Sequence, residues 1–392
     1  MEVDHVAEIQ GPYGPLAIPE QVVQQVWHER KYLCDRLETE SGRRLEVLDA
    51  GTWNAGEGPD FRNARLRIGG ESVEGDVEIH FHAKDWRQHG HDRDPEFGRV
   101  VLHVVLFPGA GEVRTASGFV PETLVLLPHL EMDLEQCLLD FRLARMEASG
   151  DLPVADLLGE LPGEALLVRL AEASAVRWGA KLGAMRKRLS GMEWADACHQ
   201  CLLEVLGGRR NRAVFARIAL EFPLEAMRGG DFSGEHLFES QRGRWRLAAT
   251  RPASHPRMRL TQYLKLIQER PQWPDSLRGV PLSVQDGAFD PCGTVSFRKA
   301  RLRVTVEALR ERVFSVMPKG VVDTLAADMA LPVLAADGGG DLYGHWYHWP
   351  PGSFPEALAR VLRQQCAERG LRVPLGNGLQ QGLLQLLNEA RG

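Results

Sequence analysis

The segment GEGPDFRNARLRIGGESVEGDVEIHFH, residues 56–82, places titratable side chains at strand spacing near its end. Four of them follow one another at every second position: Asp76, Glu78, His80 and His82. Side chains two apart on a strand share a face, so these four are expected on one face and Val77 and Ile79 on the other. Such alternation is also typical of the solvent face of an ordinary antiparallel strand. Carboxylates bind divalent cations and imidazoles orient water or bind softer metals, so the pattern indicates metal-dependent hydrolysis.

A further carboxylate, Asp60, precedes FRNARLRI, residues 61–68, which has the composition of a strand. The sequence IGGE, residues 68–71, favours a hairpin turn between this strand and the strand that carries Glu78. The hairpin is expected to bring the two carboxylates together at one end of the strand pair. Two carboxylates and a neighbouring backbone carbonyl form an oxygen site suited to Mg²⁺ or Mn²⁺.

Histidines are concentrated in the same region. Five of the thirteen fall within 24 residues, where even spacing would place fewer than one: His80, His82, His89, His91 and His103. The stretch DWRQHGHDRD, residues 85–94, would add metal ligands if it folded over the strand face, and Zn²⁺ would then be a possible ion. The alternative is a short helix capped by Asp85, with the histidines bonded to nearby backbone groups.

Hydrophobic periodicity divides the chain into two parts. The first has a helical pattern over 20–37 and strand patterns over 44–50, 61–68, 75–82, 99–107 and 123–130. Long helical patterns follow, with a loop-rich connector near 270–300 and an aromatic loop at 343–352 that either packs on helices or stacks on a base. We therefore expect an α+β fold with two domains, an α/β domain at 1–130 and a mostly α-helical domain at 131–392.

Composition narrows the classes of protein. The 392 residues are 44% hydrophobic and 26% charged, and no apolar run reaches membrane-spanning length. The N-terminal residues lack a basic region followed by an apolar one, so no signal peptide is predicted and a cytoplasmic location without a membrane partner is expected. The net charge of −6 argues against a general polyanion-binding protein.

Arginines nevertheless gather in RGRWRLAATRPASHPRMRL, residues 242–260. An arginine surface can bind the phosphates of a nucleic acid, although a high arginine content also follows from genome composition. The candidates for nucleic-acid contact are Arg242, Arg244, Arg246 and Arg251.

Cys198 and Cys201 have the spacing of a zinc knuckle. They lie within the helical pattern WADACHQCLLEVL, and no second cysteine pair accompanies them. The pattern favours a core helix, and the six scattered cysteines favour reduced thiols.

The pair Pro59 and Asp60, followed by Glu78-Ile79-His80, resembles the PD-(D/E)XK nuclease superfamily over roughly residues 20–108. The expected order of helix, three strands, short helix or loop, and strand is similar to that superfamily's core. The resemblance implies that Asp60 and Glu78 bind a metal and that His80 stands where the superfamily usually has lysine. It also implies a catalytic acid on the first helix, with Glu29 as the first candidate and Glu20 as the alternative. Histidine, with an ordinary pKa near 6.5, could orient or deprotonate water or bind Zn²⁺ or Mn²⁺.

A second resemblance covers nearly the whole chain. Its blocks include GPDFRNARLRI, GDVEIHFHAKDWRQHGHDRDPEFGRVVLHVV, RLAEASAVRWGAKLGAMRKRL and NGLQQGLLQLL. Together they resemble the bacterial family called domain of unknown function 2851, which implies no particular activity.

Three functions fit these patterns. The first is a metal-dependent nuclease in which Asp60 and Glu78 bind the ion, His80 manages the attacking water, and arginines of the helical part bind the nucleic-acid backbone. The second is a non-catalytic nuclease-like module that binds nucleic acid or a protein partner, which the missing lysine favours. The third is a histidine-rich metal hydrolase on a different β-fold. The sequence shows no Ser-His-Asp elbow, P-loop or dinucleotide-binding glycine motif.

Overall fold

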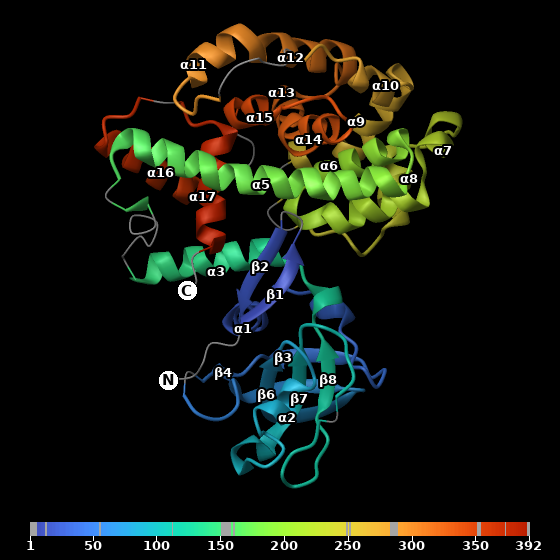
Figure 1. Cartoon of the computed structure of the whole chain (residues 1–392). Helices are drawn as coiled ribbons and strands as arrows, with labels where there is room; N and C mark the ends of the chain where they lie inside the picture. Colours follow the sequence, from blue (N-terminus) through green and yellow to red (C-terminus); the bar gives the residue numbers. More distant parts are fainter. Residues whose placement is uncertain are drawn as a thin grey trace. The chain divides into compact units, whose positions relative to one another are not determined.

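A computed structural model describes most of the chain, namely residues 6–11, 14–54, 56–111, 113–149, 158–159, 161–247, 250, 252–282, 289–350, 354–372 and 374–389. The chain forms two compact units, one of residues 1–9 and 15–148 and the other of residues 10–14 and 149–392. The first unit contains a mixed sheet with short helices and the second is helical, which confirms the expected α+β class (Figure 1). Helix α3 (Leu134–Ser149) clusters mainly with the first unit, whereas the sequence-based boundary lies at residue 130.

The main sheet of the first unit has the strand order β3-β5-β6-β7-β8, with β4 paired to β5. Its strands are β3 (Leu45–Asp49), β4 (Thr52–Trp53), β5 (Phe61–Ile68), β6 (Glu71–His80), β7 (Val100–Val105) and β8 (Glu122–Val125). The strands β3, β5 and β6 pair antiparallel, whereas β6, β7 and β8 pair parallel. All five predicted strands are present. A separate two-stranded sheet of β1 (Val6–Gly11) and β2 (Gly14–Pro19) was not predicted.

Strand β6 is central and buried on both faces. Val77 and Ile79 enter the apolar core, as predicted. The titratable side chains of the other face are buried as well, with relative exposures of 6% for Asp76, 5% for Glu78 and 1% for His80. This burial rules out the alternative in which the polar residues form an ordinary solvent-exposed strand face, because buried ionisable groups require partners.

A β-bulge explains one of these buried carboxylates. The register between β5 and β6 shifts between Phe61 and Ala64, and Asn63 has a φ of 57°. The Asn63 backbone amide donates to Oδ1 of Asp76 at 2.9 Å. A bulge changes the direction in which the neighbouring residues point. Because Asp76 binds the bulge, it fixes the geometry of the end of β5 that leads to Asp60.

Helix α1 (Glu20–His28) lies against β6 and contributes Val22, Val26 and Trp27 to the core of the first unit. It is shorter than the predicted helix at 20–37, because the chain leaves the helical conformation at Arg30, whose φ is 54°. The remaining short elements of this unit are η1 (Cys34–Arg36), α2 (Asp85–Gln88), η2 (Pro95–Arg99) and η3 (Leu127–His129). Helix α2 lies in the connection between the parallel strands β6 and β7.

The second unit is built on two long helices, α5 (Gly163–Gly191) and α6 (Trp194–Glu221), and α17 (Asn377–Glu389) packs against α5 (Figure 1). The other helices are α7 (Leu224–Gly229), α8 (Gly234–Ser240), α9 (Pro256–Glu269), α10 (Trp273–Arg278), α11 (Thr294–Phe297), α12 (Arg303–Ala308), α13 (Lys319–Leu325), α14 (Leu331–Ala336), α15 (Tyr343–His348) and α16 (Glu356–Glu368). Shorter 3₁₀ or π-helical segments are η4 (Pro252–Ser254), η5 (Arg298–Leu302), η6 (Leu309–Val313) and η7 (Ala326–Ala330).

Two local predictions have clear outcomes in this unit. Cys198 and Cys201 are buried in the core of α6, which confirms a core helix rather than a zinc knuckle. Of the expected aromatic loop at 343–352, residues 343–348 form helix α15, and residues 351 and 352 lie outside the described residues. The rings of Trp346 and Tyr347 are buried rather than available to stack on a base. In the part of the chain that the structure describes, no helix combines the length and apolar character that a membrane span requires.

Candidate metal centre

Asp60 and Glu78 lie together at the end of the β5–β6 pair, as the hairpin predicts. The backbone amide of Asp60 donates to Oε2 of Glu78 at 3.0 Å. In return, the backbone amide of Ile79 donates to Oδ2 of Asp60 at 2.9 Å. These reciprocal bonds fix both carboxylates relative to the sheet.

Helix α1 adds two side chains to this pair. Gln24 donates from Nε2 to Oδ1 of Asp60 at 2.7 Å, and Glu20 lies one helical turn before Gln24. Burial, followed by the negative charges of Asp60, Glu78 and Asp85, raises the pKa of Glu20 to about 9, although a backbone hydrogen bond with Phe81 acts in the opposite direction. Oε1 of Glu20 is buried and has no hydrogen-bond partner among the described residues.

The structure therefore places Glu20, not Glu29, at this site. Glu29 follows the last residue of α1, roughly 13 Å along the helix axis from Glu20. It accepts a hydrogen bond from Gln25 and forms an ion pair with Lys31. Glu20 and Gln24 are four residues apart and therefore share one face of α1, but the sequence alone does not show that this face meets β6.

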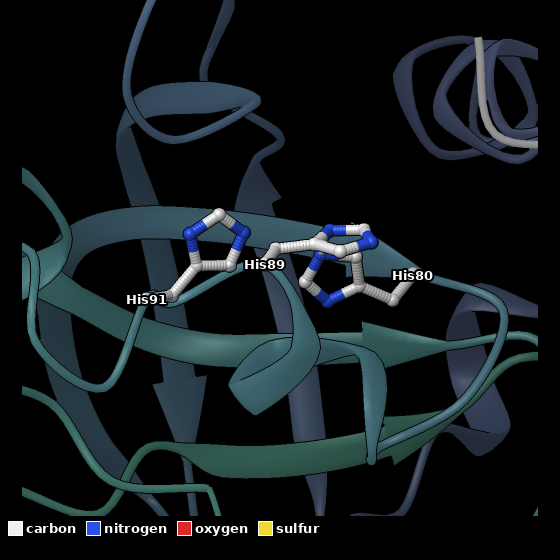
Figure 2. A group of neighbouring side chains, drawn as sticks. All are labelled: His80, His89 and His91. Carbon is white, nitrogen blue, oxygen red and sulfur yellow. Dashed lines mark hydrogen bonds between the residues drawn. The ribbon is translucent and has the colours of Figure 1, made fainter. Parts of the chain in front are cut away.

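The histidine cluster is the second part of the site. Nδ1 of His80 contacts Nε2 of His103 at 2.8 Å, and Nε2 of His80 contacts Nδ1 of His89 at 3.0 Å. His91 stacks on His80 with ring centroids 5.2 Å apart. One ligand atom each from His80, His89 and His91 lie within 4.8 Å of one another, and Figure 2 shows the three rings gathered beside β6. These histidines contact one another, so the alternative in which they bond only to backbone groups is wrong.

Glu78 joins the carboxylates to the histidines. Its Oε2 accepts the amide of Asp60, whereas its Oε1 lies 3.4 Å from Nε2 of His80 and 3.2 Å from Nε2 of His91. The two oxygens of one buried carboxylate thus face two different groups of ligands. This arrangement is suited to a carboxylate shared between neighbouring sites.

Packing holds the histidine rings in position. His91 lies flat on Phe97 with centroids 3.7 Å apart, and Trp86 contacts both His91 and His103 edge-on. His103 is fully buried, and burial together with the neighbouring His91 lowers the pKa of His103 to about 3. His103 is therefore a neutral imidazole at physiological pH, able to accept or donate one hydrogen bond toward His80.

His82, which the sequence pattern placed with the metal ligands, lies apart from them. Strand β6 ends at His80, so the alternation of faces does not extend to residue 82. The His82 ring stacks on Phe107, and its backbone amide donates to Oδ2 of Asp85.

The arginine candidates belong to the second unit. Arg242 is exposed and forms an ion pair with Glu239, and Arg244 donates to Gln241. Arg246 is tied to Asn211 through its backbone. Arg251 lies outside the described residues.

Comparison with known proteins identifies a family. Residues 20–238 match the family model described as protein of unknown function (DUF2851). No curated protein and no solved structure matches the chain. The matched segment covers more than half of the 392 residues and contains both the carboxylates and the histidine cluster. The chain belongs to the DUF2851 family of proteins of unknown function.

Proposed function

We propose that this protein is a metal-dependent phosphodiesterase that cleaves DNA or RNA, with Mg²⁺ or Mn²⁺ bound by Asp60, Glu78 and Glu20. The observation that carries the proposal is the convergence of three carboxylates at one end of a mixed sheet: Asp60 just before β5, Glu78 on β6 and Glu20 on α1. Three acidic groups brought together with little water repel one another unless a proton or a cation joins them.

The order of elements supports the same proposal. Helix α1 is followed by the antiparallel strands β3, β5 and β6, then by α2 and by β7 parallel to β6. This is the order that the resemblance to PD-(D/E)XK nucleases implies. Strands β4 and β8 are additions to it.

The residues fit a hard divalent cation. Oε1 of Glu20 is a buried oxygen without a hydrogen-bond partner among the described residues, and a bound cation would satisfy it. When bound to such carboxylates, Mg²⁺ or Mn²⁺ polarises a phosphoryl oxygen and lowers the pKa of water. The chain's own contribution is to fix the ligands, since Gln24 and the Ile79 amide hold the Asp60 carboxylate in one orientation.

His80 occupies the position two residues after Glu78 where the superfamily usually has lysine. Both of its ring nitrogens lie within hydrogen-bond distance of other histidines. We therefore assign His80 a positioning role through the histidine cluster rather than the role of a fixed cation. Phosphate contacts by Arg242, Arg244, Arg246 and Arg251 remain part of the proposal.

The raised pKa of Glu20 gives a testable dependence of stability on pH. The neutral carboxyl is favoured in the folded state, so its contribution is complete below the ordinary pKa of 4.5 and is lost as pH rises toward about 9. The Glu20→Gln variant mimics the neutral carboxyl at every pH. In the absence of metal, its free energy of unfolding relative to that of the wild type should therefore increase with pH. The difference should reach a few kcal/mol at pH 9, because each pKa unit corresponds to about 1.4 kcal/mol.

Urea unfolding in the presence of a chelator, at intervals from pH 5 to pH 9, measures this difference. Glu29→Gln is the matched control, because Glu29 lies at the far end of the same helix. Parallel stability curves for Glu20→Gln and wild type would show that Glu20 is not buried among the other carboxylates.

The direct test of the proposed function is cleavage. Purified protein is incubated with single-stranded, double-stranded and branched DNA and RNA, with Mg²⁺, Mn²⁺ or a chelator. We expect cleavage that requires the metal and stops with the chelator. Binding without cleavage under every metal, by protein shown to be folded, would contradict the nuclease and favour a nucleic-acid-binding module.

A further inference from the structure

We propose that His80, His89 and His91, with Oε1 of Glu78, form a second metal site that binds Zn²⁺ or a cation of similar softness. This site adjoins the carboxylate site but does not depend on the proposed nuclease activity. The two sites share Glu78, whose oxygens face different ligand groups.

Three of the spacings between donor atoms lie near those of tetrahedral coordination. Donors about 2.0–2.1 Å from a central Zn²⁺ are separated from one another by about 3.3–3.4 Å. Nε2 of His80 lies 3.0 Å from Nδ1 of His89 and 3.4 Å from Oε1 of Glu78. Nε2 of His91 lies 3.2 Å from the same oxygen. The three imidazole donors lie within 4.8 Å of one another, so closing around one ion would shorten the wider separations by up to about 1.4 Å.

Two separate segments of the chain supply the ligands. Glu78 and His80 come from the buried central strand, whereas His89 and His91 follow α2. Gly90, between the two histidines, has a φ of 82°, a conformation that residues with a side chain rarely adopt. This turn lets both neighbouring imidazoles face His80, and stacking of His91 on Phe97 limits its movement.

His103 orients one of the proposed ligands, His80, through a hydrogen bond. A metal on Nε2 of His80 requires the proton of that ring to be on Nδ1, which lies 2.8 Å from Nε2 of His103. Nε2 of His103 then accepts a hydrogen bond from this N–H group, and the bond fixes both the tautomer and the orientation of His80. His103 pairs with Glu78 in the parallel register of β6 and β7, so its position is set by the sheet. It is a positioning residue rather than a ligand.

The two proposed sites differ in their donor atoms and should therefore prefer different metal ions. Three imidazoles and one carboxylate favour Zn²⁺ and related transition-metal ions, whereas a site of carboxylate oxygens favours Mg²⁺ or Mn²⁺. We therefore expect the full chain to bind one Zn²⁺ that excess Mg²⁺ does not displace.

The test is a titration of chelator-treated, metal-free protein with Zn²⁺ in competition with a chromophoric chelator, followed by Co²⁺ absorption spectra. We expect one Zn²⁺ per chain and the intense Co²⁺ bands of four-coordinate geometry. His89→Ala and His91→Ala should each lower Zn²⁺ affinity by about 100-fold or more, because each loses one ligand. His236→Ala, which removes an exposed histidine of α8, should leave affinity unchanged.

His103 is tested separately. His103→Ala should weaken Zn²⁺ binding by about 10- to 100-fold, and His103→Gln, which offers an amide oxygen near the position of Nε2, should recover part of the loss. Circular dichroism and thermal unfolding establish that each variant is folded.

Folded wild-type protein that binds no stoichiometric Zn²⁺, or Zn²⁺ binding that survives loss of His89 and His91, would overturn this inference. Failure of the nuclease proposal looks different. Tight Zn²⁺ binding without any cleavage would remove the nuclease and leave the zinc site, whereas Mg²⁺-dependent cleavage without Zn²⁺ binding would do the reverse.

Discussion

Asp60→Asn is expected to lower the rate of metal-dependent nucleic-acid cleavage by about 10³-fold, with little effect on folding. The asparagine keeps an oxygen that can accept the Ile79 amide, but it loses the negative charge that binds the cation. Single-turnover cleavage at saturating Mn²⁺ measures the effect. Raising the Mn²⁺ concentration should recover part of the activity if the lost charge mainly weakens metal binding.

Asp76→Asn is the matched control for that loss. Asp76 is also a buried carboxylate of β6, but it binds the bulge amide of Asn63 and does not contact Asp60 or Glu78 in the described interactions. This variant should keep its cleavage rate per folded molecule. Equal rates for Asp60→Asn and wild type would show that Asp60 does not bind the catalytic metal.

Gly382→Ala is expected to destabilise the second unit by about 2–5 kcal/mol, because packing of α17 against α5 leaves no room for a Cβ atom. A Cβ at Gly382 would lie 2.1 Å from the carbonyl oxygen of Leu170, and this oxygen belongs to the backbone of α5. One turn earlier, a Cβ at Gly378 would lie 2.0 Å from the Tyr347 ring. Thermal and urea unfolding measure the loss.

Gly183→Ala provides the opposite expectation. Gly183 is exposed within α5, and a Cβ there would have no atom within 4 Å. Alanine should therefore stabilise the helix by up to about 1 kcal/mol. If Gly382→Ala and Gly183→Ala change the free energy of unfolding in the same direction, the close contact between α17 and α5 is not the cause of the effect at Gly382.

The sheet was predictable from the sequence because its signals are local. Short runs of branched residues separated by glycine turns define the strands, and the hairpin at 68–71 places Asp60 near Glu78. The end of α1 was not predictable in the same way. Its apolar pattern continues to Leu33, but Arg30 adopts a positive φ that no local residue preference indicates.

The site was only partly predictable. Clustering of histidines along the chain indicated a shared site, but the contact between His80 and His103 depends on the parallel register of β6 and β7. Inclusion of His82 assumed that the strand continues past His80, where it ends. Choosing Glu20 over Glu29 required the contact of α1 with β6, which spacing along one helix does not determine.

The most direct measurement is anomalous diffraction from crystals soaked in Mn²⁺ after treatment with a chelator. We expect a manganese peak within bonding distance of Asp60 and Glu78, with a carboxylate oxygen of Glu20 facing it directly or through a bound water. Crystals with an ordered β5–β6 end and no manganese peak at saturating concentration would contradict it, as would carboxylates too far apart to share an ion.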